Sequence, residues 1–214
     1  KNLSIEYTVF GINFIIVFLV FFITNKIIKK GLKQFFEDDK IEMPKLPNKS
    51  IALIMGSLIS LFTSDILINK ALLFMNSTWF GAGDPIFGQD IGYYMFQKPF
   101  IELILTYGIA MMIFLAVYTI VYYIVSFNLY FDGIELNTLK KNTFIKQMIG
   151  FVLVIAICLS MLTLLRTQDI VFEEFIKLED IEGTALIGAG FTDVTVKLWA
   201  YRIFAIVILG CVIL

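Results

Sequence analysis

Residues 8–24 read TVFGINFIIVFLVFFIT, a run of seventeen side chains without a charge. A helix that crosses a bilayer needs about 20 mostly apolar residues, because the hydrocarbon is roughly 30 Å thick and each residue rises about 1.5 Å. The apolar character extends from Tyr7 to Ile28, where a basic segment around Lys26, Lys29 and Lys30 ends it. This stretch predicts a transmembrane helix over residues 7–28.

The composition of the whole chain agrees with a membrane protein. Of its 214 residues, 59% are hydrophobic and only 16% are charged, whereas soluble domains carry about 25% charged residues. Histidine is absent, and Cys158 and Cys211 each lie inside an apolar run, where we expect them to be packing residues. No basic patch with interleaved aromatic residues indicates a nucleic-acid partner. The expected partner is the lipid bilayer.

Four more apolar stretches predict further spans. They cover residues 51–75, 100–127, 144–165 and 198–214, the last of which is still apolar at Leu214 and therefore truncated. The chain also opens on Lys1, so we expect both ends to be cuts in a longer protein. We predict an all-α fold: an integral membrane helical bundle with about five transmembrane segments and a short interfacial helix.

The second of the five spans is the least apolar, because Asp65 and Lys70 interrupt it. Small residues recur in it at every fourth position, which places them along one face of a helix, where a neighbouring backbone can approach closely. These helix-packing candidates are Ala52, Gly56, Ser60 and Ser64. Asp65 is the candidate intramembrane polar residue, since an ionisable group within a span is expensive and is often functional. A carboxylate that reaches outward toward Asn69 or Lys70 is the structural alternative.

The distribution of Lys and Arg predicts the topology. Residues 25–50 and 127–146 hold ten lysines against six acids, whereas residues 66–98 and 166–198 hold five Lys and Arg against nine acids. The positive-inside rule then places loops 29–50 and 128–143 in the cytoplasm and loops 76–99 and 166–197 outside. Within the second external loop, Val171, Phe175 and Leu178 have helical spacing, which predicts a short interfacial helix over residues 169–182.

Both external loops contain a segment rich in Gly and Asp. In the first, Gly81, Gly83, Asp84, Gly88 and Asp90 precede the aromatic residues 93–96. In the second, Gly190 lies close to Asp193. A folded interfacial loop with an aromatic anchor is one reading. The other is that Asp84, Asp90 and Asp193 converge as oxygen ligands for a hard cation or as acceptors for a partner, although their spacing fits no calcium loop, so we predict no metal ligand.

No pattern in the chain indicates catalysis. Gly81 and Gly83 lack the strand and the third glycine of a dinucleotide motif, and no Lys-Ser/Thr phosphate loop is present. The sequence contains no nucleophile with a histidine partner and no paired carboxylates in an apolar setting. We therefore predict no enzyme activity, no catalytic residue and no cofactor.

The two Gly/Asp segments resemble the bacterial membrane family called uncharacterised protein family 0182. The resemblance lies in a long pattern of Phe, Gly, Asp, Pro and Tyr residues and in a second, shorter one. These residues are Phe80, Gly81, Asp84, Pro85, Phe87, Gly88, Asp90, Ile91, Tyr94, Phe96 and Pro99, and then Gly188, Gly190, Phe191, Thr192, Asp193 and Val194. Gly92, Lys98 and Phe191 depart from the residues that the family leads us to expect. The resemblance implies a multi-pass protein of the bacterial cell membrane, with a transmembrane helix upstream and further helices and a large extracytoplasmic region downstream. It implies no activity.

Three functional hypotheses follow. The first is a non-catalytic membrane anchor or scaffold, whose partners are the remaining transmembrane helices and the external domain of the full-length protein; homo-oligomerisation stays open. The second is a transporter or channel subunit that uses Asp65 and the small-residue face of residues 51–75. The third is a membrane enzyme acting on lipid or envelope polymer through Asp84, Asp90 and Asp193.

Overall fold

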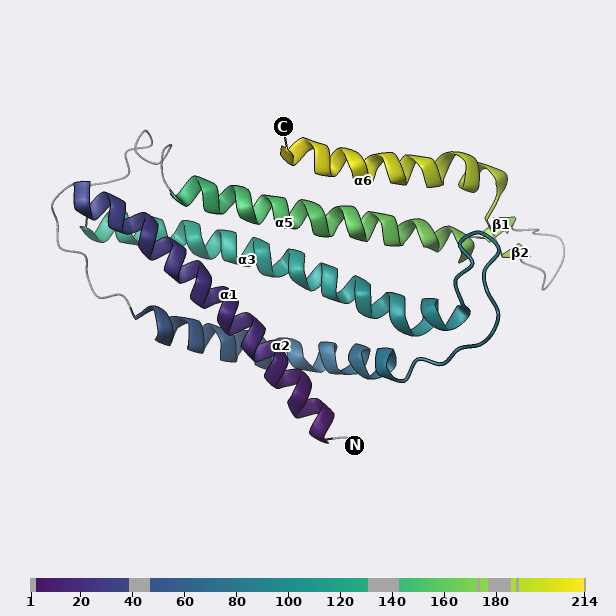
Figure 1. Cartoon of the computed structure of the whole chain (residues 1–214), viewed down its shortest axis with the longest axis horizontal. Helices are drawn as coiled ribbons and strands as arrows, with labels where there is room; N and C mark the ends of the chain where they lie inside the picture. Colours follow the sequence, from purple (N-terminus) through teal and green to yellow (C-terminus); the bar gives the residue numbers. More distant parts are fainter. Residues whose placement is uncertain are drawn as a thin grey trace. The chain divides into compact units, whose positions relative to one another are not determined.

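The computed structural model describes residues 3–38, 47–130, 143–172, 174–176, 186–187 and 189–213. Five long helices dominate it, as Figure 1 shows. They are α1 (Leu3–Asp38), α2 (Asn48–Met75), α3 (Lys98–Tyr130), α5 (Thr143–Arg166) and α6 (Leu198–Ile213). Within the described residues, five helical segments are long and apolar enough to cross a membrane. The predicted all-α bundle with about five such segments is confirmed.

The helices extend beyond the apolar runs that predicted them. The first run predicted residues 7–28, yet α1 continues through the basic segment to Asp38. Lys, Leu and Gln are good helix formers, so the backbone keeps its helical hydrogen bonds after the side chains become polar. Gly31, expected in a connector, is instead a buried residue of α1. The end of an apolar run therefore marks a change in side-chain polarity and not the end of a helix.

Two of the helices begin with a π-helical turn. The turn η1 (Tyr93–Gln97) leads into α3, and η3 (Asp193–Lys197) leads into α6. Both turns come directly after a Gly/Asp segment. Each apolar helix thus starts several residues earlier than its hydropathy alone indicated.

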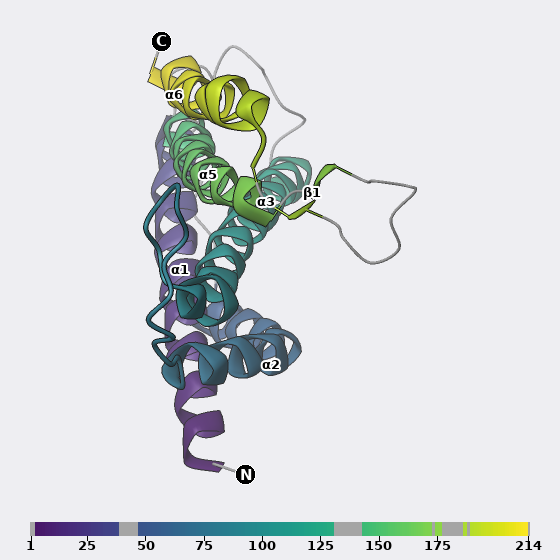
Figure 2. The same ribbon diagram turned by 90° about the vertical axis from the view of Figure 1, so that its right-hand side faces the viewer.

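The predicted interfacial helix over residues 169–182 is wrong in its extent. The chain continues from α5 into a 3₁₀ helix, η2 (Thr167–Phe172), and then forms strand β1 (Glu174–Ile176). This strand pairs antiparallel with β2 (Leu186–Ile187), and Figure 2 shows β1 leaving the helices of this part of the chain. Residues 177–182 lie outside the described residues. Phe175 and Ile176 favour extended backbone, which outweighed the imperfect helical spacing.

The chain forms two compact units. Unit 1 comprises residues 1–71 and 110–152, and unit 2 comprises residues 72–109 and 153–214. In unit 1, Ile28 and Leu32 of α1 form a buried cluster with Tyr123 and Phe127 of α3. In unit 2, α5 and α6 lie side by side (Figure 1), and Ser160 Oγ donates a 3.0 Å hydrogen bond to the carbonyl of Ala205.

The small-residue stripe of α2 is buried within unit 1. Ala52, Gly56, Ser60 and Ser64 are all inaccessible to solvent or nearly so. A Cβ atom added to Gly56 would lie 3.4 Å from the Cα of Phe18 on α1, so the two helix backbones approach closely at this point. Nearby, Asn13 Nδ2 donates a 2.9 Å hydrogen bond to Thr63 Oγ1 and joins the same two helices. Dispersion contacts and such polar bonds are what hold helices together in lipid.

Candidate functional site

The segment between α2 and η1, residues 76–92, is a compact loop that we call the Gly/Asp loop. Its two arms pair at an isolated bridge between Gly83 and Asp90. Backbone hydrogen bonds from Asp84 N to Gln89 O (2.9 Å) and from Ile91 N to Ala82 O (3.1 Å) extend this pairing. The loop reverses at Gly88, whose φ of +66° belongs to the left-handed region that favours glycine. The segment is therefore folded on its own backbone.

Asp84 holds the tip of the Gly/Asp loop together. Its Oδ1 accepts hydrogen bonds from the backbone N–H groups of Ile86 (2.9 Å) and Phe87 (2.6 Å). Its Oδ2 accepts from the N–H of Gln89 (2.8 Å) and from the hydroxyl of Tyr94 (2.9 Å). A carboxylate offers about four lone-pair sites, so this one is fully used by its own chain.

Asp90 holds the base of the loop in the same way and is almost inaccessible to solvent. Its Oδ1 accepts from the N–H groups of Phe80 (3.1 Å) and Gly92 (2.7 Å), and its Oδ2 accepts from Gly81 N–H (2.8 Å). Gly81 has a φ of +74°, a conformation that directs its N–H at the carboxylate and that L side chains rarely adopt. Asp90 therefore binds residues on both sides of the loop.

Hydrogen bonding keeps both carboxylates ionised. Partial burial acts to raise the pKa of Asp84, but the bonds from Phe87, Tyr94, Gln89 and Ile86 outweigh it and hold the pKa below its usual value. For Asp90 too, desolvation raises the pKa and is outweighed, here by the bonds from Phe80, Gly92, Gly81 and Ala82, so that its pKa is also lowered. N–H groups directed at a carboxylate stabilise its charged form. Neither side chain is suited to donate a proton near neutral pH.

Gly92 is a structural residue of this loop that the sequence did not single out as a site. A Cβ atom placed on it would lie 2.1 Å from the carbonyl oxygen of Thr78 and 2.9 Å from Asp90 Oδ1. The departure from the family pattern at this position thus coincides with a point where two backbone segments nearly touch. This close approach depends on the path of residues 78–80 in the folded loop, and the spacing of residues in the sequence does not indicate it.

The Gly/Asp loop is attached to the helices of unit 2 by aromatic and polar contacts. The ring of Tyr94 meets Phe172 of η2 edge-on, with 5.0 Å between centroids, and Tyr93 OH donates a 3.0 Å hydrogen bond to Gln168 Oε1. Phe80 of the loop stacks with Phe96, at 6.3 Å. Through η1, the loop therefore connects to the end of α5.

Lys98, a second departure from the family pattern, is buried at the start of α3. Its side chain is 5% exposed, and its Nζ binds the carboxylate of Asp169 and lies 3.7 Å from Glu102 Oε1. The amine also lies 5.8 Å from the centre of the Tyr94 ring. An amine within an apolar environment needs such compensation, and Asp169, 71 residues away, supplies it.

Asp193 and Gly190 form a separate arrangement at the start of α6. Asp193 Oδ2 accepts a 2.9 Å hydrogen bond from Gly190 N–H, and its Oδ1 lies 3.5 Å from Lys197 Nζ. Among the described residues, no group of three or more Asp, Glu, Cys or His side chains could hold a metal ion. The structure therefore does not assemble Asp84, Asp90 and Asp193 into the ligand set considered above, and Gly188 lies outside the described residues.

Asp65 lies on the exposed side of α2. Its neighbours there are Phe62 and Ile66, which are 81% and 57% exposed, while Ser64 on the other side is buried. The described residues thus place this carboxylate away from the buried stripe. Polar groups that the sequence analysis passed over lie inside unit 1 instead: Asn25 is 2% exposed and accepts a 2.7 Å hydrogen bond from Tyr118 OH.

Comparison with known proteins identifies relatives but no described activity. All of residues 1–214 match the family described as "Uncharacterised protein family (UPF0182)". A UPF0182 protein of Caldicellulosiruptor saccharolyticus is 26% identical over the whole chain, which covers 23% of that protein's length. UPF0182 proteins of Clostridium tetani and Clostridium novyi are 30% and 38% identical over 72% and 51% of the chain, and the matches cover 18% and 13% of their lengths.

The chain thus spans less than a quarter of the length of these relatives. No solved structure matches it. The match along every residue nevertheless decides the family: this chain belongs to the uncharacterised protein family UPF0182.

Proposed function

We propose that this chain is a membrane-embedded scaffold in a bacterial cell membrane, whose Gly/Asp loop positions protein that lies outside the bilayer. Its apolar helices anchor it in lipid. The lysine-rich connectors lie on the cytoplasmic side and residues 76–92 lie on the other. The proposal that the helices lie in lipid is supported by exposed Leu, Ile, Val and Phe side chains along α1, α2, α3, α5 and α6. Such a surface is stable in hydrocarbon and unfavourable in water.

The observation that carries the scaffold role is the complete use of the Asp84 carboxylate by its own chain. Four donors from residues 86–94 of the same chain occupy its two oxygens. A catalytic or metal-binding carboxylate needs at least one free lone pair, whereas a carboxylate that fixes a loop does not. The loop is thus built to keep one shape.

The outer surface of this rigid loop supports a docking role. Trp79 is 81% exposed and Phe80 is 53% exposed. Beside them, Ser77, Thr78, Gln89 and Gln97 line a hollow of about 200 Å³. Exposed aromatic residues on a fixed backbone lose little conformational entropy when they are covered, which makes them suitable anchors for a protein partner. The remaining extracytoplasmic part of the protein is the partner we propose.

The test compares Asp84→Asn with Asp65→Asn in the full-length protein. Both variants remove one negative charge and keep the side-chain shape, but only the first replaces a carboxylate oxygen that accepts loop hydrogen bonds with an NH2 group, which cannot accept them. We expect Asp84→Asn to make the extracytoplasmic part sensitive to protease in spheroplasts, and Asp65→Asn to leave it protected. Equal protection in both variants would contradict the scaffold role.

The transport alternative is tested with the same two proteins. Purified protein in liposomes should give ion and solute flux no greater than that of empty liposomes. Flux that is present in the unmodified protein and lost in Asp65→Asn, with normal folding, would favour a transporter in which Asp65 lines the path.

A further inference from the structure

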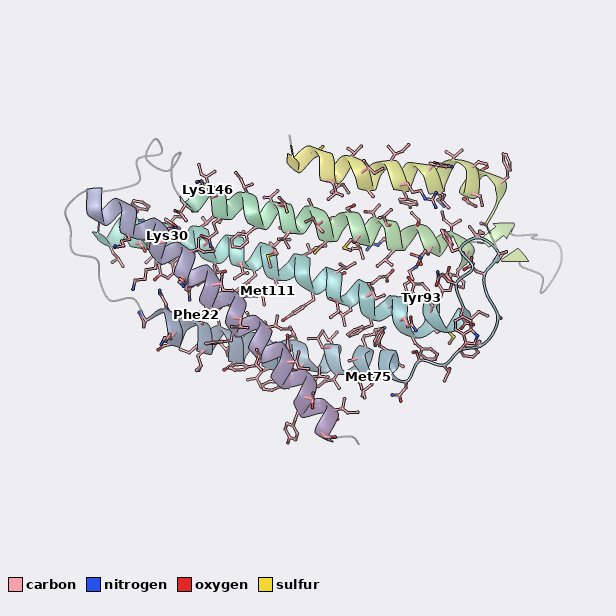
Figure 3. The ribbon with its side chains drawn as sticks, in the orientation of Figure 1. Phe22, Lys30, Met75, Tyr93, Met111 and Lys146 are labelled. Carbon is pink, nitrogen blue, oxygen red and sulfur yellow. The ribbon has the colours of Figure 1, made fainter. Side chains whose placement is uncertain are left out.

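A hollow of about 520 Å³ lies between the basic part of α1 and the first turn of α2, within unit 1. Apolar and basic side chains line it together. The lining residues are Phe22, Lys26, Lys29, Pro47, Asn48, Lys49 and Ser50. Figure 3 labels Phe22 beside α2, and shows Lys30 further along α1 at the end where α5 begins. The hollow therefore lies where the apolar part of α1 meets its basic part.

Three amines in this hollow are available to a ligand. Lys26, Lys29 and Lys49 have exposed side chains, and no ion pair within the described residues involves any of them. Phe22, Lys26 and Lys29 follow one another at intervals of four and three residues, so they share one face of α1. Lys49 approaches from the other helix. Among the side chains that the structure describes, no carboxylate forms an ion pair with these three amines.

Hydrogen bonds hold together the two helices that line the hollow. Asn25, buried on α1, donates a 3.2 Å hydrogen bond from Nδ2 to the carbonyl of Asn48, which ties the start of α2 to α1. The first hydrogen bond of α2 runs from Ile51 N to Pro47 O (3.1 Å), so the N–H groups of residues 48–50 have no acceptor inside the helix. These donors carry partial positive charge and add to that of the lysines.

An apolar path leads away from the lysines along α1. The rings of Phe14 and Phe18 are 6.2 Å apart, and those of Phe18 and Phe22 are 6.0 Å apart, with interplanar angles of 22° and 13°. All three rings are half-buried and lie on one face of the helix. They run from the hollow toward the middle of the span. The ligand that fits both features has an anionic head and long apolar chains.

From this combination we infer that the hollow binds an anionic phospholipid: the phosphate lies among Lys26, Lys29 and Lys49, and an acyl chain lies along Phe22, Phe18 and Phe14. Basic pockets between transmembrane helices at the headgroup level are suited to such lipids. The row of phenylalanine rings distinguishes a lipid from free phosphate, because free phosphate has no apolar chain that could pack against them. This inference requires only that α1 and α2 are in the bilayer, so it stands or falls independently of the scaffold role.

The experiment measures lipid retained by the full chain in a neutral detergent. Phosphatidylglycerol is titrated in and counted by native mass spectrometry, with phosphatidylcholine of the same chain length as the neutral comparison. Lys26→Gln/Lys29→Gln is compared with Lys30→Gln/Lys146→Gln. The control pair removes the same charge from exposed lysines at the same end of the bundle that do not line the hollow, and both are labelled in Figure 3.

We expect preferential retention of phosphatidylglycerol, a loss of affinity of about 30-fold in Lys26→Gln/Lys29→Gln, and little change in the control. This magnitude follows from about fivefold for each lysine that contacts an anionic headgroup. Phe22→Ser should weaken binding of long-chain phosphatidylglycerol more than that of a dihexanoyl analogue. The Phe22→Ser variant therefore tests the proposed position of the acyl chain without altering a charge.

Three results would overturn the inference. One is equal loss in the two lysine pairs, which would show diffuse attraction to the basic end. Another is equal retention of phosphatidylcholine. The third is competition by millimolar inorganic phosphate as strong as that by dihexanoyl phosphatidylglycerol, together with no effect of Phe22→Ser, which would identify a phosphate site without a lipid.

Discussion

The hydroxyl of Tyr94 donates a 2.9 Å hydrogen bond to Oδ2 of Asp84, ten residues earlier in the chain. It is the one side chain among the four donors to that carboxylate, and it comes from the π turn that leads into α3. Tyr94→Phe keeps the ring and its contact with Phe172 but removes the donor. We expect a loss of about 1–3 kcal/mol of stability, typical of a hydrogen bond to a charged group, measured by thermal unfolding in detergent. Tyr7→Phe, at a tyrosine that is 69% exposed, should change nothing.

Gly92→Ala should disrupt the Gly/Asp loop. The added methyl group would lie 2.1 Å from the carbonyl oxygen of Thr78, which belongs to the backbone and cannot move as a side chain can. We expect poor assembly and rapid cleavage of residues 76–92 by protease. Gly11→Ala is the matched control, because a methyl group at that position in α1 meets nothing within 4 Å. Normal loop protection in Gly92→Ala would show that the two segments do not approach so closely.

Lowering the pH should open the Gly/Asp loop. The pKa of Asp84 is lowered in the folded protein from an ordinary value of 3.8, so its stabilisation is fully present above pH 3.8. It is lost as the pH falls from 3.8 through the lower pKa of the folded state. Protease protection of the loop, measured after short acid pulses, should be constant from pH 7 to about pH 5 and fall below pH 4. Asp84→Asn should remove part of this dependence and leave the contribution of Asp90. A loop that opens between pH 5 and 7 would contradict this account.

The buried Lys98 and its exposed partner Asp169 should respond differently to substitution. Asp169→Asn leaves a buried amine with only Glu102, at 3.7 Å, and should destabilise unit 2. Lys98→Met replaces the amine with an apolar chain of similar length and leaves Asp169, whose side chain is 57% exposed, to be solvated, so it should cost much less. Thermal unfolding of both single variants and of the double variant gives the coupling between them. Equal costs would mean that Lys98 is not buried.

Gly56→Leu should separate α1 from α2. A Cβ atom at this position already meets the backbone of Phe18 at 3.4 Å, and a leucine side chain has no room beyond it. Cross-linking of Asn13→Cys to Thr63→Cys by a short bifunctional thiol reagent reports the distance between the helices, because those side chains are in hydrogen-bond contact. We expect the cross-link to form readily in the parent and to be strongly reduced by Gly56→Leu. Gly150→Leu, where a Cβ meets nothing within 4 Å, should have no effect.

The sequence was sufficient for features that depend on hydropathy or on helical spacing. The apolar helices follow from the length and hydropathy of the uninterrupted runs, because a helix needs about 20 apolar residues to cross a bilayer. The burial of Gly56 and Ser60 on one face follows from their spacing. The strand at Glu174–Ile176 was missed because short segments that contain Phe and Ile suit either conformation, and pairing with Leu186–Ile187 decided between them.

The contacts of the candidate site depend on information that spacing does not carry. Asp84 and Asp90 were recognised as unusual, but their role follows from which backbone N–H groups the folded loop directs at them. Likewise, nothing near Lys98 in the sequence indicates Asp169, since the two are joined only when η2 packs against the start of α3.

The π turns at Tyr93–Gln97 and Asp193–Lys197 have a consequence for how this protein tolerates length changes. A π turn accommodates roughly one residue more than an α turn, and each residue of an α-helix advances the chain by about 100° around the axis. Deleting a single residue within Tyr93–Gln97 would remove the extra residue and restore ordinary winding there, so the preceding segment would rotate by much less than this angle relative to the rest of α3. A loss of one residue at this place would therefore leave the direction in which Trp79 and Phe80 point nearly unchanged, whereas the same loss from an ordinary α turn would rotate it by about 100°.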